Sequence, residues 1–586
     1  MPPDTPTREY GNRKRVEEPI PLADFSLDRG PEVGSANGPP AVASPANSDE
    51  EDGHDWVSGW KLGIIITAIT LPCFLLLLDT SIIVTAIPQI TDDFRSLPDV
   101  GWYAAAYMIS RHVLNASSII LSRHPPADFY PSAVLQPLTG RFYTSFNSKW
   151  AFVSFVTLFE LGSLVCGVAT SSTMLIIGRA VAGMGGSGIV NGAFTIIAGC
   201  VPMPKRPPLI GFASGIAQLG LVTGPLIGGV LTEHATWRWC FYINLPIGGL
   251  VLGLIAFVHV PDEVPKAPPL SVFRTLPSDL DFIGFAIFAP SAIMLLLALQ
   301  WGGNTFAWNS SQIIGLFVGS GATFFVFLAW DHHKGDDAMI PFSIIRQRYV
   351  WASSLTYGFF MGSVFCASYY LPIYFQGVRD ASPTMSGVYI LPSVLPNILF
   401  ALAAGWLHGR VGYYLPFSLI GAILVSVSNG LLSTLSPTTS TAKWIGYQIL
   451  GGAGRGIGMQ ASIIAVQNTV EPSQIPVAMA FVMFSQAFCG AVWLAFCDLI
   501  FTNGLRALIP VYAPSVDPQT VIDGGARSLS AGSEMDAEAA WSILVAYAKT
   551  VDRVFYFAAG LSVASFVLSW FQGFKDIRKK KQVVGA

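Results

Sequence analysis

Long apolar blocks separated by short polar segments run through most of the chain. From about residue 60 onward, each block holds roughly the 20 residues that a helix needs to cross a bilayer core of about 30 Å. The blocks predict fourteen membrane-spanning helices, near residues 62–88, 101–138, 150–169, 173–200, 208–231, 239–260, 281–300, 312–330, 350–375, 385–407, 416–435, 444–466, 477–501 and 554–572. The pattern is typical of an all-α polytopic protein embedded in a lipid bilayer.

Polar tails flank the apolar blocks. Residues 1–58 are rich in Pro, Gly, Ser and acidic residues without apolar periodicity, which is typical of a disordered tail, and residues 573–586 form a basic tail. An even number of spans places both tails on one side. Short loops on that side carry ten Lys or Arg residues and those on the other side carry four, so the positive-inside rule predicts cytoplasmic termini. We expect a cell membrane protein, with a vacuolar or vesicle membrane as the alternative.

Composition narrows the function classes. Of the 586 residues, 52% are hydrophobic and 12% are charged, about half the charged fraction of soluble proteins. This excludes a soluble multidomain enzyme, and the net charge of −3 gives no long-range attraction to nucleic acid. The seven cysteines stand singly in apolar blocks, which is neither a disulfide framework nor a metal-ligand spacing. We expect a monomer that binds no nucleic acid, metal or cofactor.

The fifth apolar block carries glycines in a fixed pattern, G-x8-G-x3-G-P-x2-G-G. Small residues let membrane helices approach closely, and a single GxxxG would mean simple packing. Six positions in fixed spacing instead resemble the antiporter motif of the major facilitator superfamily, which also lies in the fifth helix. The positions are Gly211, Gly220, Gly224, Pro225, Gly228 and Gly229.

Three further segments resemble the same family, and the resemblance covers about residues 60–575. The first span contains a signature similar to that of the fourteen-span drug-proton antiporters, the fourth span contains L-x3-R-x3-G-x-G, and W-R-W-x-F-x-x-N-L-P follows the fifth span. These segments are Leu78-Asp79-Thr80-Ser81, then Leu175, Arg179, Gly183 and Gly185, and finally Trp237-Arg238-Trp239 with Asn244-Leu245-Pro246.

The resemblance implies the major facilitator fold, with a six-helix half over residues 60–260 and another over 341–572. Residues 261–340 then form a linker with two extra helices, and 503–553 form a long outer loop within the second half. Each half retains part of the family's G-x3-D-R-x-G loop motif, and two parallel halves are what alternating access requires. The loop residues are Gly140 and Arg141 in the first half and Gly405, Arg410 and Gly412 in the second. Thr144 and Gly409 stand where the family has an acid.

Ionisable residues inside spans cost a few kcal/mol each, so they usually have a function. At about 1.5 Å per residue, Asp79, Glu160 and Arg179 lie at similar depth and are expected to form one cluster. The hypothesis is that Arg179 sets the proton affinity of a carboxylate and that Asp79 or Glu160 carries the proton. The alternative is a fixed buried ion pair that sets the helix register.

Candidate substrate contacts are less specific. A mixed polar and aromatic cavity is predicted around Gln218, Arg455, Gln460 and Tyr370. Arg455 lies in a Gly-rich span, where it either attracts an anionic substrate or bonds to helix carbonyls. Asn309 begins an Asn-Ser-Ser sequon in a predicted outer loop and is a candidate glycosylation site.

The second span contains a segment that no lipid-exposed helix tolerates. Residues 111–131 include Arg111-His112 and Arg123-His124-Pro125-Pro126, and joining Ser110 directly to Ser132 restores an ordinary span. We interpret residues 111–131 as an insertion, whose simplest source is an in-frame intron retained in the coding sequence.

The leading functional hypothesis is proton-driven efflux of a small organic compound, such as a secondary metabolite, toxin or drug, by alternating access. The proton gradient would replace any cofactor. Uptake of a siderophore or nutrient by a transporter of the same fold is one alternative. A polytopic membrane acyltransferase is another, because His332 and Asp337 form a His-x4-Asp pair, although their charged loop is most simply a solvated connector.

Overall fold

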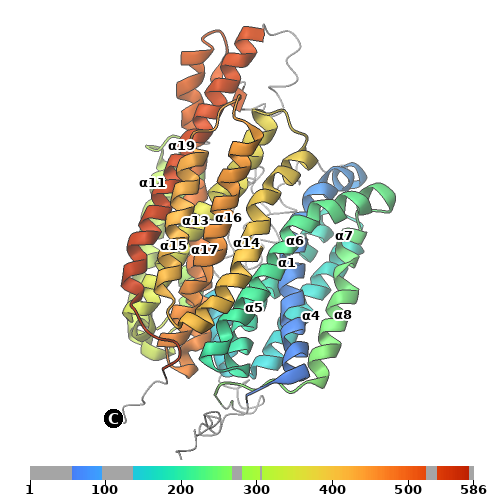
Figure 1. Cartoon of the computed structure of the whole chain (residues 1–586), viewed down its shortest axis with the longest axis vertical. Coiled ribbons are helices and arrows are strands. Elements are labelled where there is room, and N and C mark those ends of the chain that lie inside the picture. Colours follow the sequence, from blue (N-terminus) through green and yellow to red (C-terminus); the bar gives the residue numbers. More distant parts are fainter. Residues whose placement is uncertain are drawn as a thin grey trace, which may run out of the picture. The chain divides into compact units, whose positions relative to one another are not determined.

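The computed structural model describes residues 56–94, 136–264, 266, 280–303, 306–519, 521–522 and 537–579. Among these residues 13 helices are long and apolar enough to cross a membrane, and they form a helical bundle (Figure 1). The predicted span over 101–138 lies outside the described residues except for its last three positions, and so does the proposed insertion over 111–131. The other predicted spans each correspond to a helix.

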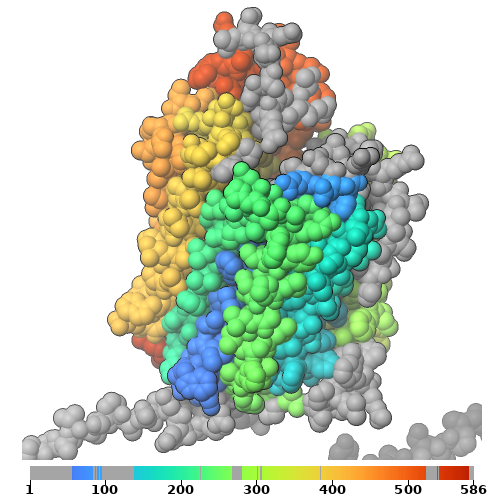
Figure 2. Space-filling model, turned by 90° about the vertical axis from the view of Figure 1, so that its right-hand side faces the viewer, coloured from blue at the N-terminus to red at the C-terminus, as the bar shows by residue number. Residues whose placement is uncertain are grey.

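In the first half, α1 packs most closely against α6, and α4 packs most closely against α5. Asn147 and Ser171 accept hydrogen bonds from the first turns of α4 and α5, so polar side chains fix where these helices begin. Helix α8 packs against both α1 and α4, and Figure 2 shows it in light green on this face. The helices are α1 (Gly59–Phe94), α3 (Gln136–Ser145), α4 (Ser148–Gly167), α5 (Ser172–Cys200), α6 (Arg206–His234), α7 (Trp239–Tyr242) and α8 (Asn244–Phe257).

A pair of helices, α10 (Phe282–Trp301) and α11 (Ser311–Lys334), occupies the predicted linker. The side chain of Phe325 on α11 is 72% exposed, as suits a surface that faces lipid. The second half follows, with α12 (Phe342–Ile345), α13 (Arg348–Gly377), α14 (Pro383–Val411), α15 (Leu415–Leu432), α16 (Thr441–Thr469), α17 (Ile475–Tyr512) and α19 (Ala537–Ser569). The predicted loop over 503–553 is too long, because α17 continues to Tyr512 and α19 begins at Ala537.

Helix α1 begins and α19 ends on the same side of the bundle, here named the termini side (Figure 1). One apolar core there contains residues of both halves, among them Ile69 and Ile197 from the first half and Ile464 and Val477 from the second. On the opposite side the described residues form separate cores. One contains Ile82, Leu175 and Phe241 of the first half, and another contains Tyr374, Leu505 and Val551 of the second. The halves therefore share a core on the termini side.

Candidate functional site

A buried ion pair joins α1 to α5. Arg179 Nη1 lies 2.7 Å from Asp79 Oδ2, and both side chains are 1% exposed. Asn244 at the start of α8 donates from Nδ2 to Asp79 Oδ1 at 3.3 Å and to Ser163 Oγ of α4 at 3.2 Å. The guanidinium also lies 5.8 Å from the ring centroid of Phe241. Four helices thus converge on one charge-balanced polar cluster inside an apolar bundle.

Glu160 lies one helical turn from Ser163 on α4, and its carboxylate is directed at α8. A Cβ added at Gly248 would overlap the Glu160 carboxylate, so the glycine provides the space for this side chain. Neither carboxylate oxygen has a hydrogen-bond partner among the described residues. Of the three predicted residues, the structure therefore brings Asp79 and Arg179 into contact and leaves Glu160 without an ion pair in the described part of the chain.

The glycine motif of α6 contacts two different neighbours. A Cβ at Gly220 or at Gly224 would overlap α1, and Ser81 Oγ of α1 donates to the Gly220 carbonyl at 3.2 Å. Gly211, nearer the termini side, faces the second half, where an added Cβ would lie 2.8 Å from the Ala401 carbonyl oxygen of α14. The motif therefore fixes α6 against α1 and also lets it approach the other half.

The remaining motif positions differ in their environment. The carbonyl of Gly228 accepts a hydrogen bond at 2.6 Å from Thr232 of the same helix, and a Cβ added at Gly229 would have no described atom within 4 Å. The backbone of Pro225 lies within α6, and its side chain is outside the described part of the structure. Among the described atoms, Gly229 therefore lacks the close contact with the second half that Gly211 makes.

Both copies of the loop motif bring the halves together on the termini side. A Cβ at Gly140 of α3 would lie 2.7 Å from Ala480 Cβ of α17, and one at Gly405 of α14 would lie 2.7 Å from the Pro207 carbonyl oxygen of α6. Arg141 donates from Nε to the Ala338 carbonyl at 2.9 Å, on the segment that follows α11. The first copy thus also anchors the linker helices.

The second copy of the loop motif is held by the C-terminal tail. Gly412 ends α14 at φ +81°, a conformation that favours glycine, and its carbonyl accepts from the Ile577 amide at 2.8 Å. The guanidinium of Arg410 stacks 3.9 Å from the Trp406 ring centroid, and Arg578 donates to the Arg410 carbonyl at 3.1 Å. Hydrogen bonds from Arg578 lower the pKa of Asp576 to about 2.

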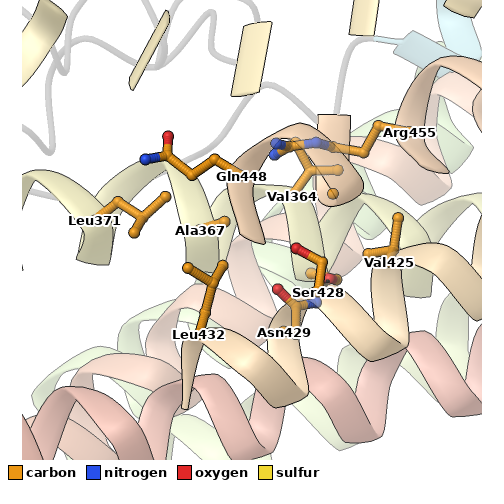
Figure 3. A pocket seen from close by; sticks show the side chains of 11 residues that line it. Val364, Ala367, Leu371, Val425, Ser428, Asn429, Leu432, Gln448 and Arg455 are labelled. Carbon is orange, nitrogen blue, oxygen red and sulfur yellow. Dashed lines mark hydrogen bonds between the residues drawn. The ribbon is translucent and has the colours of Figure 1, made fainter. Parts of the chain in front are cut away.

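Two cavities adjoin at Arg455 of α16. The first lies between the halves, and Gln218 of α6 and Tyr357 of α13 line it together with Gln460 of α16. The second lies within the second half, and Gln448 is among the residues that line it (Figure 3). Three of the four predicted cavity residues therefore line the cavity between the halves.

Tyr370, the fourth, lies elsewhere. Its side chain is 4% exposed, its ring centroid lies 5.4 Å from that of Phe501 on α17, and it belongs to the apolar core of the second half. Tyr370 therefore packs in this core and lines neither cavity. Sequence reasoning missed Tyr357, Asn429 and Gln448, and the signal that could have found them is that each is a polar side chain within an apolar helix.

The two remaining predicted sites lie at the surface. Asn309 is exposed between α10 and α11, next to Ser310, which caps α11. His332 and Asp337 are also exposed, at the end of α11 and in the turn that follows it. An exposed connector on the termini side provides no apolar pocket for an acyl chain.

A bundle of membrane-length helices in two halves, with a cavity of mixed polar and apolar lining between them, is the architecture of a membrane transporter. Residues 70–494 match the Major Facilitator Superfamily, and the chain belongs to this family. It is therefore a multi-pass transporter and not an enzyme, which confirms the predicted family and fold and excludes the acyltransferase alternative.

The sequences of known relatives match almost the whole chain. The MFS-type transporter pigP of Monascus ruber is 54% identical over 562 residues, covering 96% of this chain and 94% of its own. The efflux pump mlcE of Penicillium citrinum is 44% identical over 563 residues, covering 92% of this chain and 97% of its own. A double-tryptophan mutant of XylE has the same fold, with a TM-score of 0.55 at 14% identity, covering 89% of this chain and 97% of its own.

Proposed function

We propose that this transporter exports a small organic compound, of the secondary metabolite, toxin or drug type, in exchange for protons. The observation that carries the proposal is the buried pair of Asp79 and Arg179 beside a second buried carboxyl group, that of Glu160. Ionisable groups inside membrane-spanning helices are energetically costly, and where they occur they usually mark a proton or substrate pathway. Relatives of the chain that are named efflux pumps support the direction of transport.

The two carboxyl groups differ in what neutralises them. Arg179 balances the charge of Asp79, whereas Glu160 has no such donor among the described residues. Asn244 connects the two sites, because it bonds to Asp79 and to Ser163 one turn from Glu160. In the proposed cycle a proton on Asp79 releases Arg179, and Glu160 is the neighbouring carboxyl group that accepts or delivers the proton.

The arrangement of the cores supports one state of an alternating-access cycle. With both termini in the cytoplasm of the cell, the shared core and the contacts of Gly140 and Gly405 close the cytoplasmic side. The halves have separate cores on the other side. This is the state from which an exporter releases its substrate and takes up protons, and separation of the Gly140 and Gly405 contacts would begin the return step.

Transport into inverted membrane vesicles with an imposed pH gradient tests the proposal. We expect the wild-type protein to accumulate candidate secondary metabolites when the vesicle interior is acidic and to stop when the gradient is dissipated. Asp79→Asn and Glu160→Gln, made separately, should each change the pH dependence of accumulation. Glu233→Gln is the matched control, because Glu233 is an exposed carboxylate at the end of α6.

Three results would contradict the proposal. Accumulation that is independent of the gradient would argue against antiport. Unchanged pH dependence in both variants would remove the proton-carrying role of Asp79 and Glu160 and leave a fixed ion pair that sets helix register. A substrate that moves only in the opposite direction would favour the uptake of a siderophore or nutrient.

A further inference from the structure

We infer that Arg455 binds an acidic group of the transported compound, so that the substrate class is an amphipathic organic acid. This inference rests on the proposed export function and specifies the cargo. It begins from the position of one side chain. Arg455 lies on α16, its side chain is 8% exposed, and it lines both the cavity between the halves and the cavity within the second half.

Arg455 has no carboxylate partner among the described residues. The other buried arginines in membrane-length helices have one: Arg179 pairs with Asp79 at 2.7 Å, and Arg206 pairs with Glu263 at 2.8 Å. Arg455 donates instead to the neutral hydroxyl of Ser393 on α14. A buried guanidinium with only a neutral partner is costly, and an anion that enters the cavity would remove that cost.

The composition of the two cavities supports an acid with an apolar body. Arg455 is the one charged residue among those that line them in the described part of the chain. Polar side chains such as Gln218 and Asn429 stand beside apolar ones such as Leu371 and Ile463. Figure 3 shows the guanidinium of Arg455 and the amide of Gln448 along one side of the cavity within the second half. The lining thus offers a single positive charge within a largely uncharged surface.

Close helix packing holds Arg455 in this position. An added Cβ at Gly452 would overlap the Ser393 carbonyl of α14, and one at Gly456 would overlap the Asn397 carbonyl. On the other face, an added Cβ at Gly454 would lie 2.9 Å from the Gly421 carbonyl oxygen of α15. Glycines on two faces of α16 therefore let α14 and α15 approach it, and the long side chain of Arg455 extends toward the cavities instead of separating the helices.

A matched pair of probes tests the inference on the full-length protein in lipid nanodiscs. The probes are pyrenebutyric acid and its methyl ester, which share the apolar body and differ in the carboxylate. We expect the wild type to bind the acid at least about tenfold more tightly than the ester, and Arg455→Gln to remove that preference. Arg455→Lys should retain part of it. Arg346→Gln, which removes an exposed arginine from a loop, is the charge control.

A measurement on the wild type alone guards against a variant that fails to fold. As the pH falls and the probe becomes protonated, its affinity should fall toward that of the ester. Equal affinities for acid and ester, no binding of the acid, or equal weakening of both probes by Arg455→Gln would each overturn the inference. Failure of the inference would leave gradient-driven export by wild-type vesicles intact, whereas failure of the proposed export would leave acid binding in nanodiscs intact.

Discussion

Helices α5 and α16 correspond to the fourth predicted spans of their respective halves, and both have 29 residues. The eighth residue is Arg179 in α5 and Gln448 in α16, whereas the fifteenth is Gly186 in α5 and Arg455 in α16. The two halves therefore place their arginines two helical turns apart on the same scaffold. In the first half the arginine is neutralised by Asp79, and in the second it faces the cavities.

The two halves share one helical architecture but place their charges differently, and we assign them different tasks. In the first half, Asp79 and Arg179 balance each other's charge, so protonation of Asp79 would release Arg179. In the second half, Arg455 has no carboxylate partner among the described residues. The second half is therefore suited to bind a ligand that supplies a carboxylate. Under our proposals, coupling belongs to the first half and recognition to the second.

The largest effect is expected from Asp79→Asn, which gives the first half the unpaired arginine of the second. The change leaves Arg179 buried without its carboxylate and should destabilise the protein by about 3–5 kcal/mol, as breaking a buried ion pair does. Thermal unfolding in nanodiscs measures the loss. The double variant with Arg179→Gln should recover part of it, and no recovery would mean that the charge is not the cause.

The reverse change gives the second half the internal pair of the first. Ser393→Asp places a carboxylate on the residue that bonds Arg455, and it should lower the affinity for an organic acid by at least about tenfold, because the guanidinium is then already neutralised. Binding of pyrenebutyric acid in nanodiscs measures the change. Ser393→Asn is the uncharged control of similar size, and equal loss in both variants would show a steric effect.

Substitution of packed glycines should also affect α5 and α16 differently, with a smaller loss of stability than Asp79→Asn causes. An added Cβ at Gly185 of α5 would lie 2.6 Å from the Phe155 carbonyl oxygen, whereas at Gly458 of α16 the nearest atom, the Gly421 Cα, would lie at 3.0 Å. Gly185→Ala should therefore destabilise by about 1–3 kcal/mol and Gly458→Ala by less, as measured by thermal unfolding. Gly229→Ala, where no described atom lies within 4 Å, is the control.

The smallest effect is expected at the second copy of the loop motif. The C-terminal tail holds this copy, whereas Arg141 anchors the first copy to the linker helices. Because Arg578 lowers the pKa of Asp576 to about 2, the folded state favours the ionised carboxylate. Its contribution is present above the ordinary pKa near 4 and is lost as the pH falls through about 2. Asp576→Asn should slightly increase proteolysis of the tail at neutral pH, and unchanged proteolysis would show that the pair does not hold it.

Much of the fold and of the ion-pair site can be predicted from the apolar pattern of the sequence and from the depth of each residue along its span. Blocks of about 20 apolar residues predict the spans, and counting along them brings Asp79 to the level of Arg179. Depth does not determine which face of a helix a residue occupies, so it could not predict the isolation of Glu160 against Gly248. Nor does it reveal partners on distant segments, such as the Ala338 carbonyl that accepts from Arg141.

The predicted outer loop was too long for a different reason. Hydropathy falls after residue 501, but apolar residues continue at helical spacing, with Leu505 and Ile509 in α17 and Ile543 and Tyr547 in α19. Their side chains pack in the core of the second half. Periodicity rather than mean hydropathy was the signal that identifies these helical extensions.

Those extensions have a practical consequence. Helix α17 has 38 residues and α19 has 33, so at about 1.5 Å per residue both are longer than the roughly 30 Å core of a bilayer. In Figure 1 they rise together above the neighbouring helix ends. Such a paired, continuous projection is a natural epitope for an antibody fragment, whose added mass would orient particles of a small transporter during electron-microscopic imaging.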